Sequence, residues 1–129
     1  MILDTSALVA ILFGEPEADH FIRLIHAADH CLISAGSFLE LSVVSERQTG
    51  PEVARHGDTF LRRAGIIVEP FTVEQAYTAR QAFHDFGKGR HPAGLNFGDC
   101  FAYALSKIAG EPLLFKGEDF RQTDVVSAL

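Results

Sequence analysis

The sequence predicts an α/β fold in which helices cover both faces of a parallel sheet. Short segments that are apolar throughout alternate with longer segments whose apolar residues recur at helical spacing. Strands of a parallel sheet are buried on both faces and are joined by helical crossovers, which produces this alternation. The 129 residues, 47% of them apolar, are enough for one domain over residues 1–129 with a three-layer α/β/α arrangement.

The first half of the chain is predicted to form two strands, each followed by helices. Three residues that favour helix N-termini, Asp4, Thr5 and Ser6, follow the first apolar run. Pro16 suits the first turn of a second helix, because an N–H in that position has no helical partner. In order, the predicted elements are a strand at residues 1–3, a helix at 7–13, a helix from Pro16, a strand at 31–33 and a helix from Ser34 or Ser37 to about Gln48.

The second half is predicted to continue this alternation and to contain one clear loop. Thr72 and Gln75 fit a capping box, in which Thr72 bonds forward and Gln75 reaches back. Asn96 can cap a later helix, which Gly110 ends. In order, the predicted elements are a helix at 51–64, a buried strand at 66–68, a helix from Thr72 to about Phe86, a Gly-rich loop at 87–95, a helix from Asn96 to about Ala109, a strand at 113–115, a turn at 118–121 and a last strand at Val125 and Val126.

The composition argues against membrane and exported proteins. The longest apolar run, residues 7–13, is far shorter than the roughly 20 residues that span a bilayer, and the start of the chain lacks a basic segment. The two cysteines, Cys31 and Cys100, each lie in an apolar stretch, and we expect them to be free buried thiols. These features predict a cytoplasmic protein.

Charge is unevenly distributed along the chain. The net charge of −6 argues against a basic surface that holds nucleic acid. Residues 1–40 contain six acidic residues and one arginine, whereas residues 80–116 contain five basic and three acidic residues. In the Gly-rich loop, Lys88 and Arg90 are either weak candidates for contact with an RNA backbone or solvated surface charges. An acidic protein with such a basic segment can still approach a polyanion, especially when cations neutralise its acidic face.

Four acidic residues are predicted to meet at the carboxyl edge of the sheet, where ligands of such folds bind. Asp4 closes the first strand, Asp119 follows the strand that ends at Phe115, and Glu40 and Asp99 lie near the starts of helices at this edge. Each acid alone has an explanation as a cap or turn residue. Four carboxylates without a fixed cation among them would repel one another unless a metal ion joined them. Mg²⁺ and Mn²⁺ take such ligands and can promote phosphodiester hydrolysis.

At these residues the chain resembles the PIN-domain family and, within it, the VapC-type toxins of bacterial toxin–antitoxin pairs. The likeness spans the whole chain and rests on four segments in a fixed order: residues 1–8 with Asp4, the third helix with Glu40, residues 95–104 with Asp99, and residues 113–124 with Asp119. The resemblance implies a central five-stranded parallel sheet. It also implies an Mg²⁺- or Mn²⁺-dependent endoribonuclease in which the four acids are the metal-binding and catalytic residues.

The resemblance further implies supporting residues and partners. Thr5 or Ser6 matches a hydroxyl that orients the first aspartate, and Asn96 matches a polar position beside the third acid. Asp124 either joins the site or begins the last strand. Members of this family are usually homodimers, and a cognate VapB-type antitoxin holds them inactive by placing a basic side chain among the acids. RNA is the implied substrate.

Two other functional classes remain open. A phosphoryl-aspartate enzyme, similar to a phosphatase, would also place acids at strand ends, with Asp4 as its nucleophile. Asp4-Thr5-Ser6 lacks the second aspartate, two residues on, that phosphatases of the haloacid-dehalogenase type use. A non-catalytic, PIN-like module would keep the fold and bind a partner peptide, although the presence of all four acids gives no sign that activity has been lost.

Overall fold

Four parallel strands form the centre of the molecule, and the computed structural model describes all 129 residues. The strands follow the order β3-β2-β1-β4 across the sheet. Leu32 of β2 pairs with Ile2 of β1 on one side and with Ile67 of β3 on the other. The strands are β1 (Ile2–Leu3), β2 (Leu32–Ser34), β3 (Ile67–Glu69) and β4 (Leu113–Leu114). This is the α/β fold with a parallel sheet that the alternation predicts.

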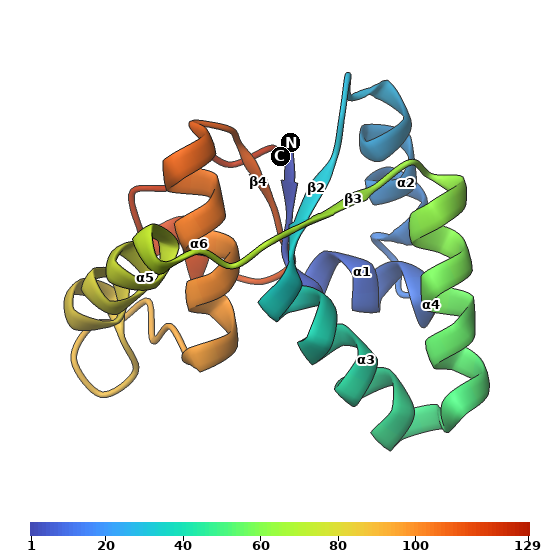
Figure 1. The fold of residues 1–129 in the computed structure, drawn as a ribbon, viewed down its shortest axis with the longest axis horizontal. Helices are drawn as coiled ribbons and strands as arrows, with labels where there is room; N and C mark the ends of the chain where they lie inside the picture. The colour runs from blue at the N-terminus through green and yellow to red at the C-terminus, as the bar shows by residue number, and fades with distance from the viewer.

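Helices cover both faces of the sheet, as predicted (Figure 1). The helices are α1 (Thr5–Leu12), α2 (Ala18–Ala27), α3 (Ala35–Thr49), α4 (Pro51–Arg63), α5 (Val73–Phe86) and α6 (Phe97–Ala109), followed by the short 3₁₀ helix η1 (Phe120–Gln122). Figure 1 shows α5 and α6 on one side of the strands and the other four helices on the opposite side. Each side has its own apolar core. None of the helices combines the length and hydrophobicity that a bilayer crossing requires.

The helix starts follow from local sequence, and most of the predicted caps are confirmed. Asp4, Ser34, Thr72 and Asn96 each accept a hydrogen bond from a backbone N–H in the first turn of the helix that follows. The predicted return bond of the Thr72 capping box is wrong. The Gln75 Nε2 instead donates to the Pro70 carbonyl at 3.2 Å, upstream of the cap.

The fifth strand implied by the resemblance is wrong, because only a single parallel bridge joins Leu113 to Ser127. Leu113 donates to the Val126 carbonyl at 2.8 Å and accepts from the Ala128 N–H at 2.9 Å. The ladder cannot extend upstream, because both backbone groups of Glu111 are engaged elsewhere. The Glu111 N–H donates to the Ser106 carbonyl at 3.2 Å, and the Glu111 carbonyl accepts from the Ser106 hydroxyl at 2.7 Å.

The strand predicted as buried at residues 66–68 is buried only at its start. Ile66 is 7% exposed, whereas Ile67 is 53% and Val68 is 41% exposed. The reason is topological, because β3 is an edge strand that pairs with β2 alone. An apolar triplet has the same sequence pattern at the edge of a sheet as at its centre.

Candidate active site

Asp4, the first of the four predicted acids along the chain, lies at the carboxyl end of β1. Its Oδ2 atom accepts hydrogen bonds from the Ser6 N–H at 2.9 Å and the Ser6 hydroxyl at 2.6 Å. Its Oδ1 atom is buried and has no hydrogen-bond partner. Burial is the main cause that raises the pKa of Asp4 to about 6, and the negative charge of Glu40 adds to it. A buried carboxylate oxygen without a partner is costly unless another group binds it.

Ser6 connects Asp4 to the neighbouring strand. The backbone N–H of Lys116, which follows β4, donates to the Ser6 hydroxyl oxygen at 3.0 Å. The Ser6 hydroxyl therefore accepts a hydrogen bond from the segment after β4 and donates one to Asp4 at the end of β1. The Thr5 hydroxyl instead donates to the Ser37 carbonyl at 3.1 Å, which joins α1 to α3. Of the two expected hydroxyls, Ser6 is the one that orients Asp4.

Asp99 enters the site from the first turn of α6, where it forms a capping box with Asn96. Its Oδ2 atom accepts from the Asn96 N–H at 2.9 Å, and the Asn96 Oδ1 atom accepts from the Asp99 N–H at the same distance. Burial raises the pKa of Asp99 to about 7, and the charges of Asp4, Asp119 and Glu40 raise it further. The other three predicted acids therefore lie within electrostatic reach of Asp99.

Glu40 reaches this site because two glycines allow α3 and α6 to approach each other. The Glu40 carboxylate lies directly against Gly98 of α6, where a Cβ atom would collide with it. In the reciprocal contact, the Phe101 ring of α6 lies against Gly36 of α3. The sequence interpretation did not identify these glycines. Their sequence signal is position alone, since Gly36 is four residues before Glu40 and Gly98 is next to Asp99.

Asp119 and Asp124 have different surroundings. Asp119 is exposed at the start of η1, and its charge contributes to the raised pKa of Asp99. Asp124 accepts from the Tyr103 hydroxyl at 2.6 Å and pairs with Lys107 at 3.0 Å, both further along α6. These contacts lower the pKa of Asp124 despite its partial burial. The structure therefore does not bring Asp124 to the other acids. Asp124 instead anchors the C-terminal segment to α6.

The arrangement suits a hydrated divalent ion better than a closed cage of protein ligands. No three His, Cys, Asp or Glu side chains converge closely enough to hold an ion between them. Mg²⁺ usually keeps several waters and needs only one or two direct carboxylates. Asp4 offers a free buried oxygen for that purpose. Lys116, which follows β4, does not pair with these acids. Its ammonium group pairs with Glu15 and with Glu17, the latter at 3.2 Å.

The two loop cations proposed for RNA contact lie in the connection between α5 and α6. Lys88 is exposed, and the Arg90 guanidinium contacts the His84 Nδ1 atom at 3.0 Å. The loop is fixed by a bridge between Gly87 and Leu95, so its two cations lie on an ordered turn after α5. Both cysteines are free and buried, as expected.

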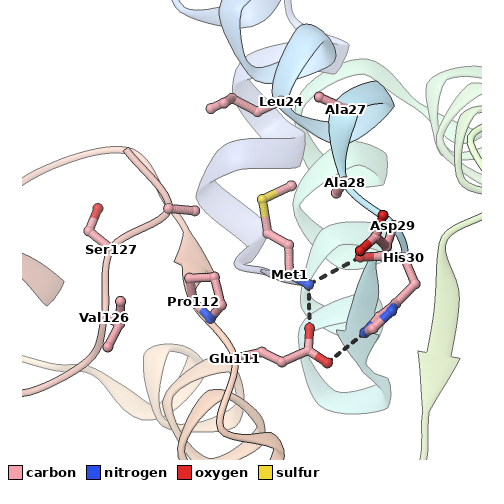
Figure 2. A pocket seen from close by; sticks show the side chains of 11 residues that line it. Met1, Leu24, Ala27, Ala28, Asp29, His30, Glu111, Pro112, Val126 and Ser127 are labelled. Atoms are coloured by element: carbon pink, nitrogen blue, oxygen red, sulfur yellow. Dashed lines mark hydrogen bonds and ion pairs between the residues drawn. The ribbon is translucent and has the colours of Figure 1, made fainter.

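A hollow lies at the opposite, amino edge of the sheet (Figure 2). Its volume is about 580 Å³. Glu111, which lines this hollow, pairs with both the Met1 ammonium group and the His30 ring. Those contacts lower the pKa of Glu111, so this carboxylate is already neutralised by its neighbours.

Comparison with known proteins identifies the family. A sequence profile described as the PIN domain matches residues 1–126. Ribonuclease VapC30 of Mycobacterium tuberculosis is 48% identical over 127 residues, which cover 98% of this chain and 97% of that protein. Ribonuclease VapC of Mycolicibacterium smegmatis is 47% identical over 127 residues, 98% of each chain.

Solved structures share the fold at lower identity. Mycobacterium tuberculosis VapC20, described as a sarcin–ricin loop cleaving toxin, superimposes with a TM-score of 0.79 at 18% identity, over 97% of this chain and 95% of that one. VapBC2 from Rickettsia felis, solved with a promoter DNA fragment, gives a TM-score of 0.72 at 17% identity, over 98% of this chain and 95% of that one. The profile match and the close relatives together show that the chain belongs to the PIN-domain family, with VapC ribonucleases among its relatives.

Proposed function

We propose that this protein is an endoribonuclease toxin that hydrolyses RNA phosphodiester bonds with Mg²⁺ or Mn²⁺. One observation carries the proposal: the buried Asp4 Oδ1 atom has no partner, at a place where three further carboxylates raise the local negative charge. Relatives at 47–48% identity are named VapC ribonucleases. RNA hydrolysis in the cytoplasm is the activity that best explains both features.

Asp4, Glu40, Asp99 and Asp119 are the residues that would hold the ion. Once bound, a divalent cation supplies charge stabilisation for the developing phosphorane and lowers the pKa of water. The chain's own residues supply orientation. Ser6 holds one Asp4 oxygen and leaves the other free, and Asn96 fixes the Asp99 carboxylate against the start of α6. Each carboxylate therefore presents a defined oxygen to the site.

The proposal is tested by cleavage of a fluorescent panel of single-stranded RNAs with the purified, antitoxin-free protein. Cleavage is expected with Mg²⁺ or Mn²⁺ and is expected to stop in EDTA. Asp4→Asn is expected to abolish it. Asp124→Asn is the matched control, because this aspartate pairs with Tyr103 and Lys107 and should not affect the chemistry. Cleavage that persists in EDTA, or in Asp4→Asn, would contradict the proposal.

The alternative classes receive less support from the same residues. A phosphoryl-aspartate enzyme of the haloacid-dehalogenase type uses a second aspartate two residues after its nucleophile, whereas Ser6 stands at that position and donates to Asp4. A non-catalytic module has no need for a buried carboxylate oxygen without a partner, which lowers stability. No specific observation favours either class.

Inhibition by a VapB-type antitoxin follows from the same negative charge. An arginine or lysine inserted among the acids would pair with the carboxylates that a metal ion would otherwise bind. Fold neighbours have been solved as VapBC2 from Rickettsia felis and as a toxin–antitoxin complex from Klebsiella pneumoniae. In a test by co-expression with a VapB-type antitoxin, the complex is expected to lose RNase activity.

A second copy of the chain is the proposed cover for an exposed apolar surface. The exposed apolar side chains that such a copy could cover are Leu39 and Val43 on α3, Ile67 and Val68 on the edge strand β3, and Val73 and Tyr77 on α5. On each helix the two residues are four apart and share one face. Monomeric proteins rarely expose large apolar patches. Sedimentation analysis is expected to give the mass of a dimer, and Ile67→Lys is expected to give a monomer.

A further inference from the structure

A row of three aromatic rings lies beside the proposed active site, with Phe97 exposed and Phe101 and Phe71 half-buried. Phe97, the first residue of α6, is 80% exposed although it directly precedes Gly98, which contacts the Glu40 carboxylate. The Phe97 and Phe101 rings meet edge to face with centroids 5.1 Å apart, and the Phe101 and Phe71 rings do so at 4.7 Å. Three aromatic rings therefore run from the acids toward α5.

This row borders an apolar groove between α5 and α6 of about 400 Å³, a volume typical of ligand pockets. Its walls are apolar apart from one cation. The groove is lined by Phe71, Ala76, Ala79, Arg80, Phe83, Phe97, Cys100 and Phe101. No acidic side chain lines it, although the protein as a whole is acidic. Aromatic rings combined with a cation are the usual surface for single-stranded nucleic acids.

Packing alone does not explain Phe97. The neighbouring Phe101 fills the space above Gly36 and so holds α3 against α6. Phe97 has no such role, because most of its surface remains exposed to water. Its position at the end of α6 nearest the acids places it where a nucleotide would extend from a phosphate bound by them. A base that left the stack could then lie against its ring.

We infer that Phe97 and this groove hold a nucleobase next to the scissile phosphate of single-stranded RNA. The inference rests on the proposed RNase function and adds a positioning residue to it. Stacking on Phe97 supplies affinity. Arg80 is the one cation that lines the groove, and its guanidinium lies over the Tyr77 ring on the outer side of α5, 5.1 Å from the ring centroid. An aromatic face stacks on any base, so the Phe97 contact orients the strand without requiring one sequence.

The first test uses the absence of tryptophan from the chain. In an Asp4→Asn background, which prevents cleavage, Phe97→Trp creates a single fluorescent reporter at the groove. Titration with a short single-stranded RNA of mixed sequence is expected to quench it, whereas an abasic oligonucleotide is not. Val126→Trp in the same background is the matched control, because Val126 is 69% exposed at the amino edge of the sheet. Equal quenching at both positions would overturn the inference.

The second test separates stacking from simple burial. Phe97→Ala and Phe97→Leu are each expected to weaken RNA binding about tenfold, and Phe97→Tyr is expected to retain it, because only the aromatic variant can stack. If Phe97→Leu binds as tightly as wild type, stacking is not the contact. A change of sedimenting mass in Phe97→Ala with unchanged RNA affinity would assign the residue to a protein interface instead.

These outcomes are distinguishable from failure of the proposed function. Wild-type protein that cleaves RNA with Mg²⁺, together with Phe97→Ala that binds and cleaves equally well, overturns the inference alone. Wild-type protein that neither binds nor cleaves any RNA in the panel overturns both.

Discussion

The two edges of the sheet both contain carboxylates, but the pKa is lowered at one edge and raised at the other. At the amino edge, Glu111 is paired with the Met1 ammonium and the His30 ring, and its pKa is lowered (Figure 2). At the carboxyl edge, Asp4 and Asp99 have no cation beside them, and their pKa values are raised to about 6 and about 7. The hollow is at the amino edge, yet the unsatisfied charge is at the other.

This contrast separates a carboxylate that the fold itself neutralises from the carboxylates assigned to the site under the proposed function. Glu111 is neutralised by the Met1 ammonium group and the His30 ring, so it needs no counter-ion from solution. Asp4 has one buried oxygen without a partner, which lowers stability, and under the proposed function a bound cation would offset this cost.

The largest expected effect comes from exchanging carboxylates for amides at the two edges. Asp4→Asn is expected to lower RNA cleavage by at least about 100-fold, because it removes charge where the reaction needs it. Glu111→Gln is expected to leave cleavage unchanged and to lower the free energy of unfolding by about 0.5–1 kcal/mol, through loss of a partly exposed ion pair. Cleavage assays and urea melts measure both. If Asp4→Asn and Glu111→Gln lost cleavage activity equally, the two edges would not differ in function.

The next effect concerns the hydroxyl that orients Asp4. Ser6→Ala is expected to lower cleavage about 10- to 100-fold, as loss of a group that orients a metal ligand does. Ser6→Thr is expected to restore it, since the hydroxyl returns. Thr49→Ala is the control, because the Thr49 hydroxyl bonds only to the Ser45 carbonyl within α3. Normal activity in Ser6→Ala would remove Ser6 from the mechanism.

A smaller loss is expected when the helix contact is disturbed. In Gly98→Ala the new Cβ would collide with the Glu40 carboxylate, which must swing away. Cleavage is expected to fall about tenfold, because a small misplacement of a reacting group is costly. The helical Gly57 is the matched control, since a Cβ there meets only Leu12 at an ordinary 3.4 Å. Gly57→Ala should leave cleavage intact.

The raised pKa values predict an unusual dependence of stability on pH. Between about pH 4 and 7 the folded protein retains protons on Asp4 and Asp99 that the unfolded chain has released. In EDTA the free energy of unfolding should therefore fall as pH rises, by at most about 1.4 kcal/mol per pH unit for each group. Asp99→Asn should reduce this slope, and Mg²⁺ should restore stability at pH 8. Urea melts at several pH values would contradict this if stability rose throughout.

The smallest effect is expected from the loop cations. Lys88→Ala combined with Arg90→Ala should weaken RNA binding and lower the slope of log affinity against log salt by about 1.4, if each contacts one phosphate of a single strand. Binding titrations at several salt concentrations measure this slope. An unchanged slope would assign both side chains to solvated surface charge.

The sequence predicted best what depends on neighbouring residues. Asp4, Thr72 and Asn96 cap their helices as expected, because a cap and its partner lie within three residues. The contacts of Gly36 and Gly98 could not be predicted in this way, since each glycine meets a side chain from a distant helix. The same limit applies to β3, whose apolar residues do not indicate whether the strand is central or at an edge.

The candidate site was predicted as a set of residue types but not as an arrangement. Four carboxylates at the carboxyl ends of strands follow from topology alone. That Ser6 rather than Thr5 orients Asp4 depends on which hydroxyl faces the strand end, and Thr5 faces the Ser37 carbonyl of α3 instead. Asp124 was left open because its partners, Tyr103 and Lys107, become neighbours only when the C-terminal segment folds back on α6.

The contact between Glu40 and Gly98 makes formation of the proposed site depend on synthesis of α6. Glu40 is synthesised early, but it has no surface to rest against until α6 has emerged from the ribosome and docked. Asp119 follows still later. A nascent or truncated chain that stops before α6 therefore carries Asp4 and Glu40 without a formed site. The order in which the acids occur along the chain delays the nuclease until almost all of the protein exists.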